Sequence, residues 1–510
     1  MKKFNTAGLD TQMMRSLSAD EASWIYCGLD CCVTLEVYNR LAEELASSPE
    51  NVRYTYETAL AKQAPVLEMS MRGLLVDEAA RKGAIAELQH HLDRLNARFQ
   101  RILREVFDFE MNWDSPTQVK TFFYGTLGIS EIKKRNQKGQ FVATVDEKAL
   151  NKLCLHFYAQ PFALYILAMR DLRKKIGFLK TQIDPDSRMR ANINIAGTNT
   201  GRFSSAMNDF GTGTNLQNVD NALRFPFIAD ARKILVNVDL EQADARNVGA
   251  IIWNLFRESH SEKAAGAYLD ACESGDLHTF VCRMAWADLD WPKDRSGWRA
   301  IADQKAYRDF SYRDLAKRLG HGTNYYGTPR TMASHTQTET RIIEQFQERY
   351  FAAFPLIPEW HKHVIEAVKT EGVLTTPYGR RRFFFGRGDD QSTWRKAIAY
   401  APQSMTGHQI DMGLLNLWRE MPEAELLMQV HDSILFQVPW KGHEQYIERA
   451  LELMKYEREL IAHRVFYVPL EAQVGWNWGK QSEKNFYGIT KWKGQEMRTP
   501  PVAKRLEDYL

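Results

Sequence analysis

The chain has 510 residues, and its 67 lysines and arginines against 64 aspartates and glutamates leave a net charge of +3. A chain of this length exceeds one compact core, so several domains or one large domain with lobes is expected. Hydrophobic residues make up 44% and charged residues 26%, which excludes an intrinsically disordered protein. Because the net charge is small, binding to a polyanion would have to come from local basic clusters.

Membrane and secretory classes are also disfavoured. No stretch approaches the roughly 20 apolar residues of a membrane helix, and the N-terminal segment MKKFNTAGLD lacks the apolar centre of a signal peptide. We therefore expect a cytosolic or nucleoid enzyme without a membrane partner. The six cysteines show neither the paired spacing of a zinc site nor a disulfide framework, so they are expected to be reduced and mostly structural.

The first clear element is a long amphipathic helix after Asp77, a favourable N-cap. Its apolar positions recur at steps of three and four, at Ile85, Leu88, Leu92, Leu95, Phe99, Leu103 and Val106. A second helix is predicted in SPTQVKTFF, where Ser115 caps and Pro116 suits the first turn. A basic segment follows, with Lys133, Lys134, Arg135 and Lys138. Long helices with a basic tip suit a clamp on a duplex backbone, and a solvated charged loop is an equally good interpretation of this segment alone.

The character of the sequence changes near residue 190, where a polar segment rich in Gly, Asn, Ser and Thr begins. Beyond it, residues 234–239 (ILVNVD) are predicted to form a buried strand that ends on an acid. Residues 426–438 (LLMQVHDSILFQV) predict two strands around a tight polar turn, and a third strand from Val468 completes a small sheet. Between these strands lies a long, largely helical insertion rich in tryptophan, from about residue 263 to 395.

Two aspartates lie at the ends of these predicted strands, Asp239 and Asp432. Carboxylates at strand ends can lie within bridging distance of metal ions, and phosphoryl transfer often uses two divalent cations about 3.5–4 Å apart. Hard oxygen ligands of this kind favour magnesium. A single acid after a strand is more often a helix cap or a turn residue, so the pair alone is weak evidence.

A second group of residues lies in the segment RDLAKRLGHGTNYYGT. Its side chains are spaced by four and therefore share one helix face: Arg313, Lys317, His321 and Tyr325. The cations suit a triphosphate, and a ring can stack on a base. The alternative is a solvated basic helix with core aromatics. Gly320 and Gly322, each costing about 1 kcal/mol in a helix interior, predict the close approach of a ligand or of a neighbouring element.

Seven segments now occur in one order: TGRFSS with NLQNV, VDLEQADAR, GDLHTF, the R-x-x-x-K helix, PYGRRRFF, APQS and QVHDS. In these segments, from about residue 55 to 480, the chain resembles the family A DNA polymerases, which include the bacterial repair polymerase and many bacteriophage replicases. The resemblance implies an α+β right-hand fold with a helical thumb, a palm carrying a small antiparallel sheet, and helical fingers. The implied domains are an exonuclease-like remnant at 1–50, the thumb at 51–190, the palm at 191–262, the fingers at 263–395, and the second part of the palm with a tail at 396–510.

The activity implied by the resemblance is DNA-templated extension of a primer with deoxynucleoside triphosphates, in a bacterial or phage-infected cell. Asp239 and Asp432 would bind two Mg²⁺ ions, for which Mn²⁺ could substitute, and Lys317 would protonate the leaving pyrophosphate. The residues implied to bind the nucleotide are Gln242, Asp244, His278, Arg313, Lys317, His321 and Tyr325, with Tyr326 as the alternative to Tyr325. Those implied to bind DNA are Lys133, Lys134, Arg202, Arg246, Gln403 and His431.

Three positions depart from the family pattern. Asp244 stands where Glu usually acts as a gate against the ribose 2′-hydroxyl, so weaker exclusion of ribonucleotides is expected. His321 replaces the usual Phe or Tyr, which predicts altered handling of dideoxy terminators. Ser433 follows His431 and Asp432 as it does in single-subunit RNA polymerases, the nearest rival, although the bulk of Asp244 and the lack of a promoter-binding domain argue against RNA synthesis. A catalytically silent DNA-binding subunit is the other alternative, and the retained acids and cations argue against it.

The N-terminal segment matches only the end of the family's proofreading domain. Tyr26 and Asp30 fit its last motif, Y-x-x-x-D, and the earlier acidic motifs are absent. One carboxylate cannot assemble a two-metal nuclease, so proofreading by this chain is not expected. A separate exonuclease polypeptide that docks on residues 1–50 and a truncated sequence both remain open. Residues 481–510 extend past the usual family end as a surface tail or a partner site.

Overall fold

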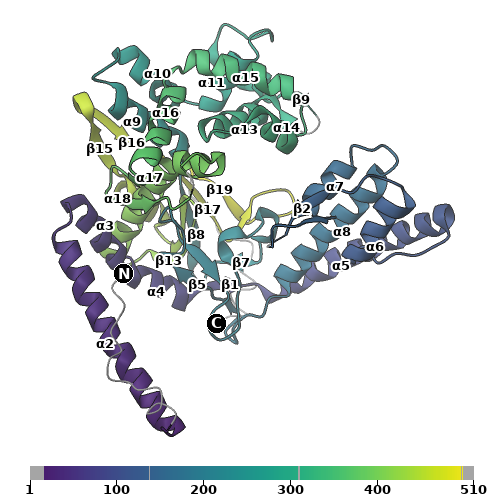
Figure 1. The fold of residues 1–510 in the computed structure, drawn as a ribbon, viewed down its shortest axis with the longest axis horizontal. Coiled ribbons are helices and arrows are strands. Elements are labelled where there is room, and N and C mark those ends of the chain that lie inside the picture. Colours follow the sequence, from purple (N-terminus) through teal and green to yellow (C-terminus); the bar gives the residue numbers. More distant parts are fainter. Residues whose placement is uncertain (1–15, 137, 308–309, 387, 495–496, 498–510) are drawn as a thin grey trace.

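The computed structural model describes residues 16–136, 138–307, 310–386, 388–494 and 497. A sheet lies at the centre, a group of helices lies above it in Figure 1, and a helical arm projects to one side. A single long helix, α2, projects from the opposite side. None of the described helices combines the length and the apolar character needed to cross a membrane.

The central sheet has nine strands in the order β13-β14-β8-β17-β19-β18-β7-β1-β4. Its pairs are antiparallel except for β18 with β19. The sheet is larger than the small antiparallel sheet expected, because strands too short to show an alternating pattern extend it on one side. The strands are β1 (Leu74–Val76), β4 (Arg188–Met189), β7 (Phe227–Ile228), β8 (Lys233–Leu240), β13 (Glu425–Val430), β14 (Ser433–Pro439), β17 (Leu470–Gly475), β18 (Asn477–Lys480) and β19 (Gly488–Lys491).

The strands predicted at 234–239, at 426–438 and from Val468 are confirmed as β8, β13 with β14, and β17. Strand β8 pairs with β14 on one side and with β17 on the other, and most of its residues are buried. The sequence of such a central strand is a continuous run of mostly apolar residues because both faces of the strand are covered. Helices α17 (Gln391–Glu420) and α18 (His443–Met454) pack on this sheet and on each other, and α9 (Ala243–Phe256) packs against α17.

The helical arm contains the long helix predicted after Asp77, observed as α5 (Glu78–Phe107). The Asp77 side chain accepts a hydrogen bond from the Ala80 amide at 2.9 Å, as expected of an N-cap. The arm has its own hydrophobic core within residues 92–176. Its other elements are α6 (Pro116–Lys120), a π-helical turn at Thr121–Thr126, β2 (Lys133–Arg135), β3 (Phe141–Ala143), α7 (Glu147–Leu153) and α8 (Gln160–Leu179).

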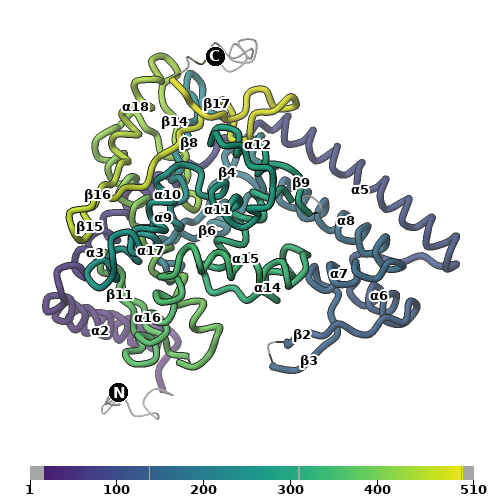
Figure 2. The backbone as a smooth tube through the Cα atoms, turned by 90° about the horizontal axis from the view of Figure 1, so that it is seen from above, coloured from purple at the N-terminus to yellow at the C-terminus, as the bar shows by residue number. Residues whose placement is uncertain are grey.

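Residues that precede α5 belong with the sheet rather than with the arm. Val66, Met69, Leu74 and Val76 are buried in the main hydrophobic core, which also contains β8 and β14. The arm therefore begins after β1, and its helices α5 to α8 extend away from the rest of the chain (Figure 2). The elements concerned are α3 (Glu50–Ala61), α4 (Gln63–Arg72) and β1.

The helical group above the sheet corresponds to the predicted Trp-rich insertion. Its elements are α10 (Glu262–Glu273), α11 (Leu277–Ala285), α12 (Trp298–Ala302), β9 (Lys305–Tyr307), β10 (Phe310–Ser311), α13 (Tyr312–Asn324), α14 (Pro329–Thr336), α15 (Thr340–Ala353) and α16 (Leu356–Thr370). Small two-stranded sheets complete the fold: β5 (Asn192–Asn194) with β6 (Ser204–Ala206), β11 (Val373–Thr375) with β12 (Arg381–Phe383), and β15 (Glu457–Leu460) with β16 (Arg464–Tyr467).

Helix α2 (Ala19–Ala46) buries none of its residues. It carries Cys27, Cys31 and Cys32, which are exposed, whereas Cys272 and Cys282 are buried. All six cysteines are free thiols. The expectation that they are mostly structural therefore holds for the buried pair and not for the three on α2.

Candidate active site

The two predicted metal-binding aspartates lie at the same edge of the sheet. Asp239 is near the end of β8, opposite Ser433 of β14 and opposite Glu471 of β17. Asp432 lies in the turn between β13 and β14, and its carbonyl oxygen accepts a hydrogen bond from the Leu240 amide at 3.0 Å. The pairing of these strands thus brings together two acids that are 193 positions apart in the sequence.

The turn that presents Asp432 is held in a conformation unusual for a residue other than glycine. His431 has a positive φ of 56°, in the left-handed region. Gln429 donates a hydrogen bond to the His431 carbonyl at 2.6 Å, and Gln217 donates one to the Gln429 carbonyl at 2.6 Å. These contacts stabilise the turn and aim the Asp432 side chain, a strained arrangement of the kind that clusters at functional sites.

The electrostatics of the pair favour a bound cation. Burial raises the pKa of Asp239, and the negative charges of Asp432 and Glu471 raise it further. Burial also raises the pKa of Asp432. Within the described ranges no group of three or more His, Cys, Asp or Glu side chains forms a ready-made metal site. Carboxylate oxygens are hard ligands, so the two acids fit a divalent cation.

Helix α13 presents the predicted basic stripe. It begins at a capping box in which the Ser311 hydroxyl and the Asp314 side chain satisfy each other's backbone amides. Arg313 donates two hydrogen bonds of 2.8 Å to the Asp276 carboxylate, whereas Lys317 and His321 are exposed. The helix ends at Asn324, so Tyr325 is its C-cap rather than an interior residue.

The two glycines of this helix have different surroundings. A Cβ on Gly322 would lie 2.5 Å from the Met332 sulfur on α14, so the predicted close approach is confirmed as that of a neighbouring element. A Cβ on Gly320 would meet only the Tyr350 ring, at ordinary contact distance.

His278 faces the cations of α13 from the neighbouring helix α11. Burial lowers its pKa to about 4, and the charges of Arg313 and Lys317 contribute to the shift. The imidazole is therefore neutral near pH 7. Burial alone would raise the pKa of Asp276, but hydrogen bonds from Arg313 and Thr279 outweigh it and hold that pKa well below its usual range. Asp276 thus stays ionised and fixes the Arg313 guanidinium.

Asp244, the predicted sugar gate, accepts three hydrogen bonds. They come from Arg202 Nη2 at 2.8 Å, Thr406 Oγ1 at 2.7 Å and Tyr325 Oη at 2.9 Å. Behind it, Asn247 donates to Thr406 Oγ1 at 3.0 Å. The Asp244 carboxylate is therefore held by side chains from three separate parts of the chain.

These contacts also settle the orientation of the two adjacent tyrosines. Tyr325 points to Asp244, whereas Tyr326 has a positive φ of 61° and packs its ring against His361 and Trp394.

Comparison with known proteins identifies the fold. The family model of DNA polymerase family A matches residues 81–255 and 299–480, more than half of the chain. The chain belongs to DNA polymerase family A. The chain is 24% identical over 434 residues to "DNA polymerase I, thermostable" of Thermus aquaticus, covering 81% of this chain and 46% of that protein. It is 26% identical over 445 residues to DNA polymerase I of Mycobacterium leprae, covering 81% and 44%.

The chain thus spans about half the length of the curated relatives it matches. Its structure is similar to the POL domain of Pol1 from M. smegmatis, solved in complex with a DNA primer-template and dNTP. The TM-score is 0.66 at 22% identity, and the match covers 82% of this chain and 70% of that one. This likeness confirms the expected α+β fold of the right-hand type.

Other predicted site residues of this family A member lie apart from the acids or are covered. Lys133 and Lys134 lie on the arm in ion pairs with Glu131 and Asp146. Arg246 is buried within α9. The remaining two lie at the edge of the site: Gln242 begins α9 with a positive φ of 56°, and Gln403 is half-buried on α17.

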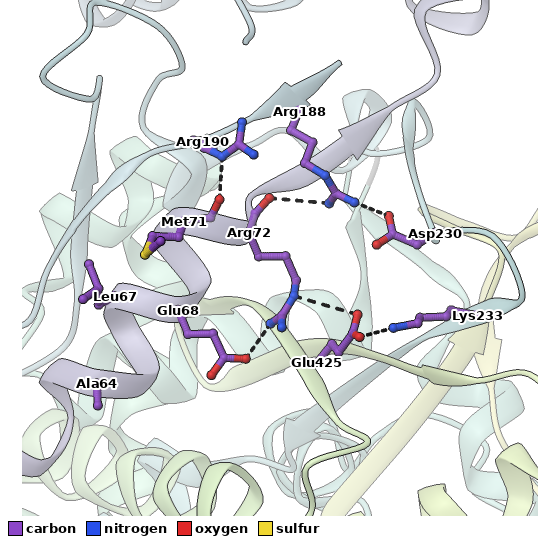
Figure 3. Close-up of a pocket in the computed structure, with 10 residues that line it drawn as sticks. All are labelled: Ala64, Leu67, Glu68, Met71, Arg72, Arg188, Arg190, Asp230, Lys233 and Glu425. Carbon is purple, nitrogen blue, oxygen red and sulfur yellow. Dashed lines mark hydrogen bonds and ion pairs between the residues drawn. The ribbon is translucent and has the colours of Figure 1, made fainter. Parts of the chain in front are cut away.

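A hollow of about 670 Å³ lies elsewhere on the protein, between α4 and the sheet edge (Figure 3). It adjoins Lys233 at the start of β8, about 20 Å from Asp239 by the rise of the strand. Its charged side chains pair with one another, as Arg188 does with Asp230 at 2.6 Å. Because these charged side chains already form ion pairs with each other, few of them are available to bind a ligand, and we do not assign a binding function to this hollow.

Four residues of the site escaped prediction because their partners are distant in sequence. Gln217 and Asp276 lie within the quoted segments NLQNV and GDLHTF, so the resemblance could have drawn attention to them. Asn247 and Thr406 carry no sequence signal, since a buried polar residue on a helix is usually structural.

Proposed function

We propose that the protein is a DNA-templated DNA polymerase that extends a primer with deoxynucleoside triphosphates. The observation that carries this proposal is that side-chain interactions connect the acid pair, Asp239 and Asp432, with the cationic helix α13. The charges of Arg202 and Asp244 act on the Asp432 carboxyl, and Asp244 also accepts a hydrogen bond from Tyr325 at the end of α13. Membership of family A supports the same chemistry.

Asp239 and Asp432 would hold two magnesium ions, with manganese as a substitute. When bound, such ions lower the pKa of the attacking hydroxyl and neutralise charge on the transferring phosphoryl group. Arg313 and Lys317 would bind the triphosphate, because preorganised cations stabilise the charge that develops on it. His278, neutral at pH 7, would contribute a hydrogen bond and not a charge.

The remaining residues would bind the sugar, the bases and the DNA. Tyr325 and His321, whose rings meet edge to face at 4.6 Å, would cover the nascent base pair. Asp244 and Gln242 would line the sugar site, and Tyr326 would support Tyr325 from behind. The residues proposed to contact primer–template DNA are Arg202, Gln403 and His431 near the site and Lys133 and Lys134 on the arm. Arg246, also expected to bind DNA, is buried within α9 and is not proposed as a contact. A cytoplasmic, nucleoid-associated location follows from this substrate.

Primer extension on a defined DNA template tests the proposal. With magnesium and all four deoxynucleotides, the folded chain should add the bases that the template dictates. Extension only with ribonucleotides would favour a single-subunit RNA polymerase. Tight DNA binding without extension under either condition would favour a silent DNA-binding subunit.

The sugar gate allows a sharper prediction. Asp244→Glu should raise the preference for deoxynucleotides over ribonucleotides by about tenfold, since the longer side chain fills the space under the 2′-hydroxyl. Single-nucleotide incorporation with dATP and ATP, expressed as a ratio of kcat/KM values, measures the change. Equal ratios for the two proteins would show that the clamped Asp244 already excludes the ribose hydroxyl. Thr406→Ser, which keeps the hydroxyl, serves as the control.

Proofreading by this chain is not proposed; a separate exonuclease polypeptide that docks on residues 1–50 is the partner proposed for this segment. The docking proposal is supported by α2, which exposes the large apolar side chains Trp24, Tyr26, Leu35 and Tyr38 to water. Proofreading is disfavoured because the described residues form no cluster of acids around Asp30. The intact chain should therefore leave a 3′-labelled primer undegraded without nucleotides, and Asp30→Ala should change nothing. If an added exonuclease bound as well to a chain lacking residues 1–46 as to the intact one, the docking proposal would fail.

A further inference from the structure

A hairpin between α16 and α17 exposes two phenylalanines side by side. Strands β11 and β12 form the hairpin. Phe383 ends the second strand and Phe385 lies two residues beyond it, with 58% and 94% of their surfaces exposed. Their rings are stacked, with centroids 6.1 Å apart and planes 17° apart. Phe384 points the other way, toward Tyr400. The alternating directions of the side chains from Phe383 to Phe385 thus leave two rings in water, which is costly unless something covers them.

Basic residues surround this pair of rings. Arg380, Arg381 and Arg382 immediately precede it, and Arg381 is exposed. In the described ranges none of the three is ion-paired with a carboxylate; the Arg382 guanidinium instead lies 4.7 Å from the centre of the Phe384 ring. The hollow of Figure 3 is the opposite case, because its arginines are neutralised by acids. The hairpin therefore offers uncompensated positive charge next to flat apolar surface.

The turn of the hairpin, residues 376–380, adjoins the proposed active site. Arg380 packs so closely on Gly201 that a Cβ there would lie 2.5 Å from its guanidinium carbon. The next residue, Arg202, is hydrogen-bonded to Asp244. On the other side, the Tyr400 hydroxyl donates to the Arg380 carbonyl at 2.9 Å, and Tyr400 lies on α17 one turn before Gln403. A strand that leaves the site along α17 can therefore reach the exposed rings.

We propose that this aromatic and basic hairpin, residues 380–386, binds the unpaired template strand outside the nucleotide site. The identity of the strand rests on the proposed polymerase function. Bases stack on aromatic rings with little regard to sequence, and arginines bind phosphates through charge-assisted hydrogen bonds. A protein partner fits less well, because the cores of protein interfaces are depleted of charge. A single-stranded nucleic acid would contact both features, its bases stacking on the rings and its phosphates binding the arginines.

The double variant Phe383→Ala/Phe385→Ala tests the proposal. Both side chains are exposed, so the chain should fold normally. We expect its affinity for a primer–template with a 15-nucleotide overhang to fall about tenfold, and that for a 2-nucleotide overhang to change less than about twofold. Affinity for labelled oligo(dT)20 should fall in parallel in fluorescence anisotropy, and Arg381→Gln should reduce the salt dependence of that binding by about one phosphate contact.

Phe486→Ala provides the matched control, because that ring is 68% exposed on another surface. Equal losses on both overhangs would place the hairpin on the duplex and overturn the proposal, as would unchanged binding to all three DNAs, which would redirect attention to a protein partner. The oligo(dT) measurement needs no catalysis. It therefore reports on the hairpin even if primer extension fails, which separates this proposal from the polymerase function.

Discussion

Asp239→Asn is expected to abolish primer extension, with kcat lower by at least about 10³, and to raise the melting temperature of the metal-free protein. The loss follows because a bound cation contributes several kcal/mol to such transfers, and each 1.36 kcal/mol is about tenfold in rate. Asp432→Asn should have the same effect on extension. Extension that persists in either variant would contradict the assignment of the acid pair.

The gain in stability has a definite pH dependence. Burial, Asp432 and Glu471 together raise the pKa of Asp239 above its ordinary value. Between the ordinary pKa and the raised one, the folded state binds more protons than the unfolded state, so stability falls as the pH rises through that window. Asparagine removes this penalty. The increase in melting temperature should therefore be a few degrees at pH 7.5 and smaller at pH 5, as about 1 kcal/mol shifts a domain of this size by only about 2–4 °C or less.

Scanning calorimetry in a chelating buffer measures this change, with Asp290→Asn as an exposed control. The melting temperature of the Asp290→Asn variant should equal that of the parent protein at both pH values. A variant Asp239→Asn that melts lower than the parent at pH 7.5 would mean that the carboxylate makes a favourable contact in the folded chain, and the repulsion argued for the pair would be wrong.

The parts of the fold that could be predicted depend on local patterns. The long arm helix follows from apolar steps of three and four, and β8 and β14 follow from continuous apolar runs. The acid pair was predictable because it ends such strands. The short strands β1, β4 and β7 have two or three residues each and carry no readable period, so the sheet was underestimated.

The contacts that shape the site depend instead on the tertiary fold. Thr406 reaches Asp244 across 162 positions, and Gln217 reaches Gln429 across 212. Arg313 is held by hydrogen bonds to Asp276. The position of Asp276 before a helix predicts only that it is an N-cap, and it does also cap α11. No propensity or spacing could predict these partners. Likewise, the choice between Tyr325 and Tyr326 depended on where α13 ends, the least predictable feature of a helix.

The arrangement around α13 allows the contribution of Lys317 to activity to be measured separately from that of Arg313. Both cations are proposed to bind the triphosphate, but Arg313 also forms two hydrogen bonds with Asp276, so its replacement would disturb the packing of α11. Lys317 is exposed and has no ion pair in the described part of the chain. Its substitution should therefore change activity without changing stability.

Lys317→Met should lower kcat for single-nucleotide incorporation by about 10²–10³, the usual cost of removing one donor from a developing anion. Arg318→Met is the matched control, because that side chain lies over the Phe310 ring, 4.8 Å from its centre, on another side of the helix. Lys317→Arg adds a second distinction. If the ammonium only attracts the triphosphate, arginine should restore most of KM and kcat; if it also passes a proton to pyrophosphate, arginine should restore KM alone, since a guanidinium does not give up its proton near pH 7. Rapid-quench measurements of both variants from pH 6 to 9 decide between these roles, and a Lys317→Met enzyme within about twofold of the parent would remove Lys317 from the site.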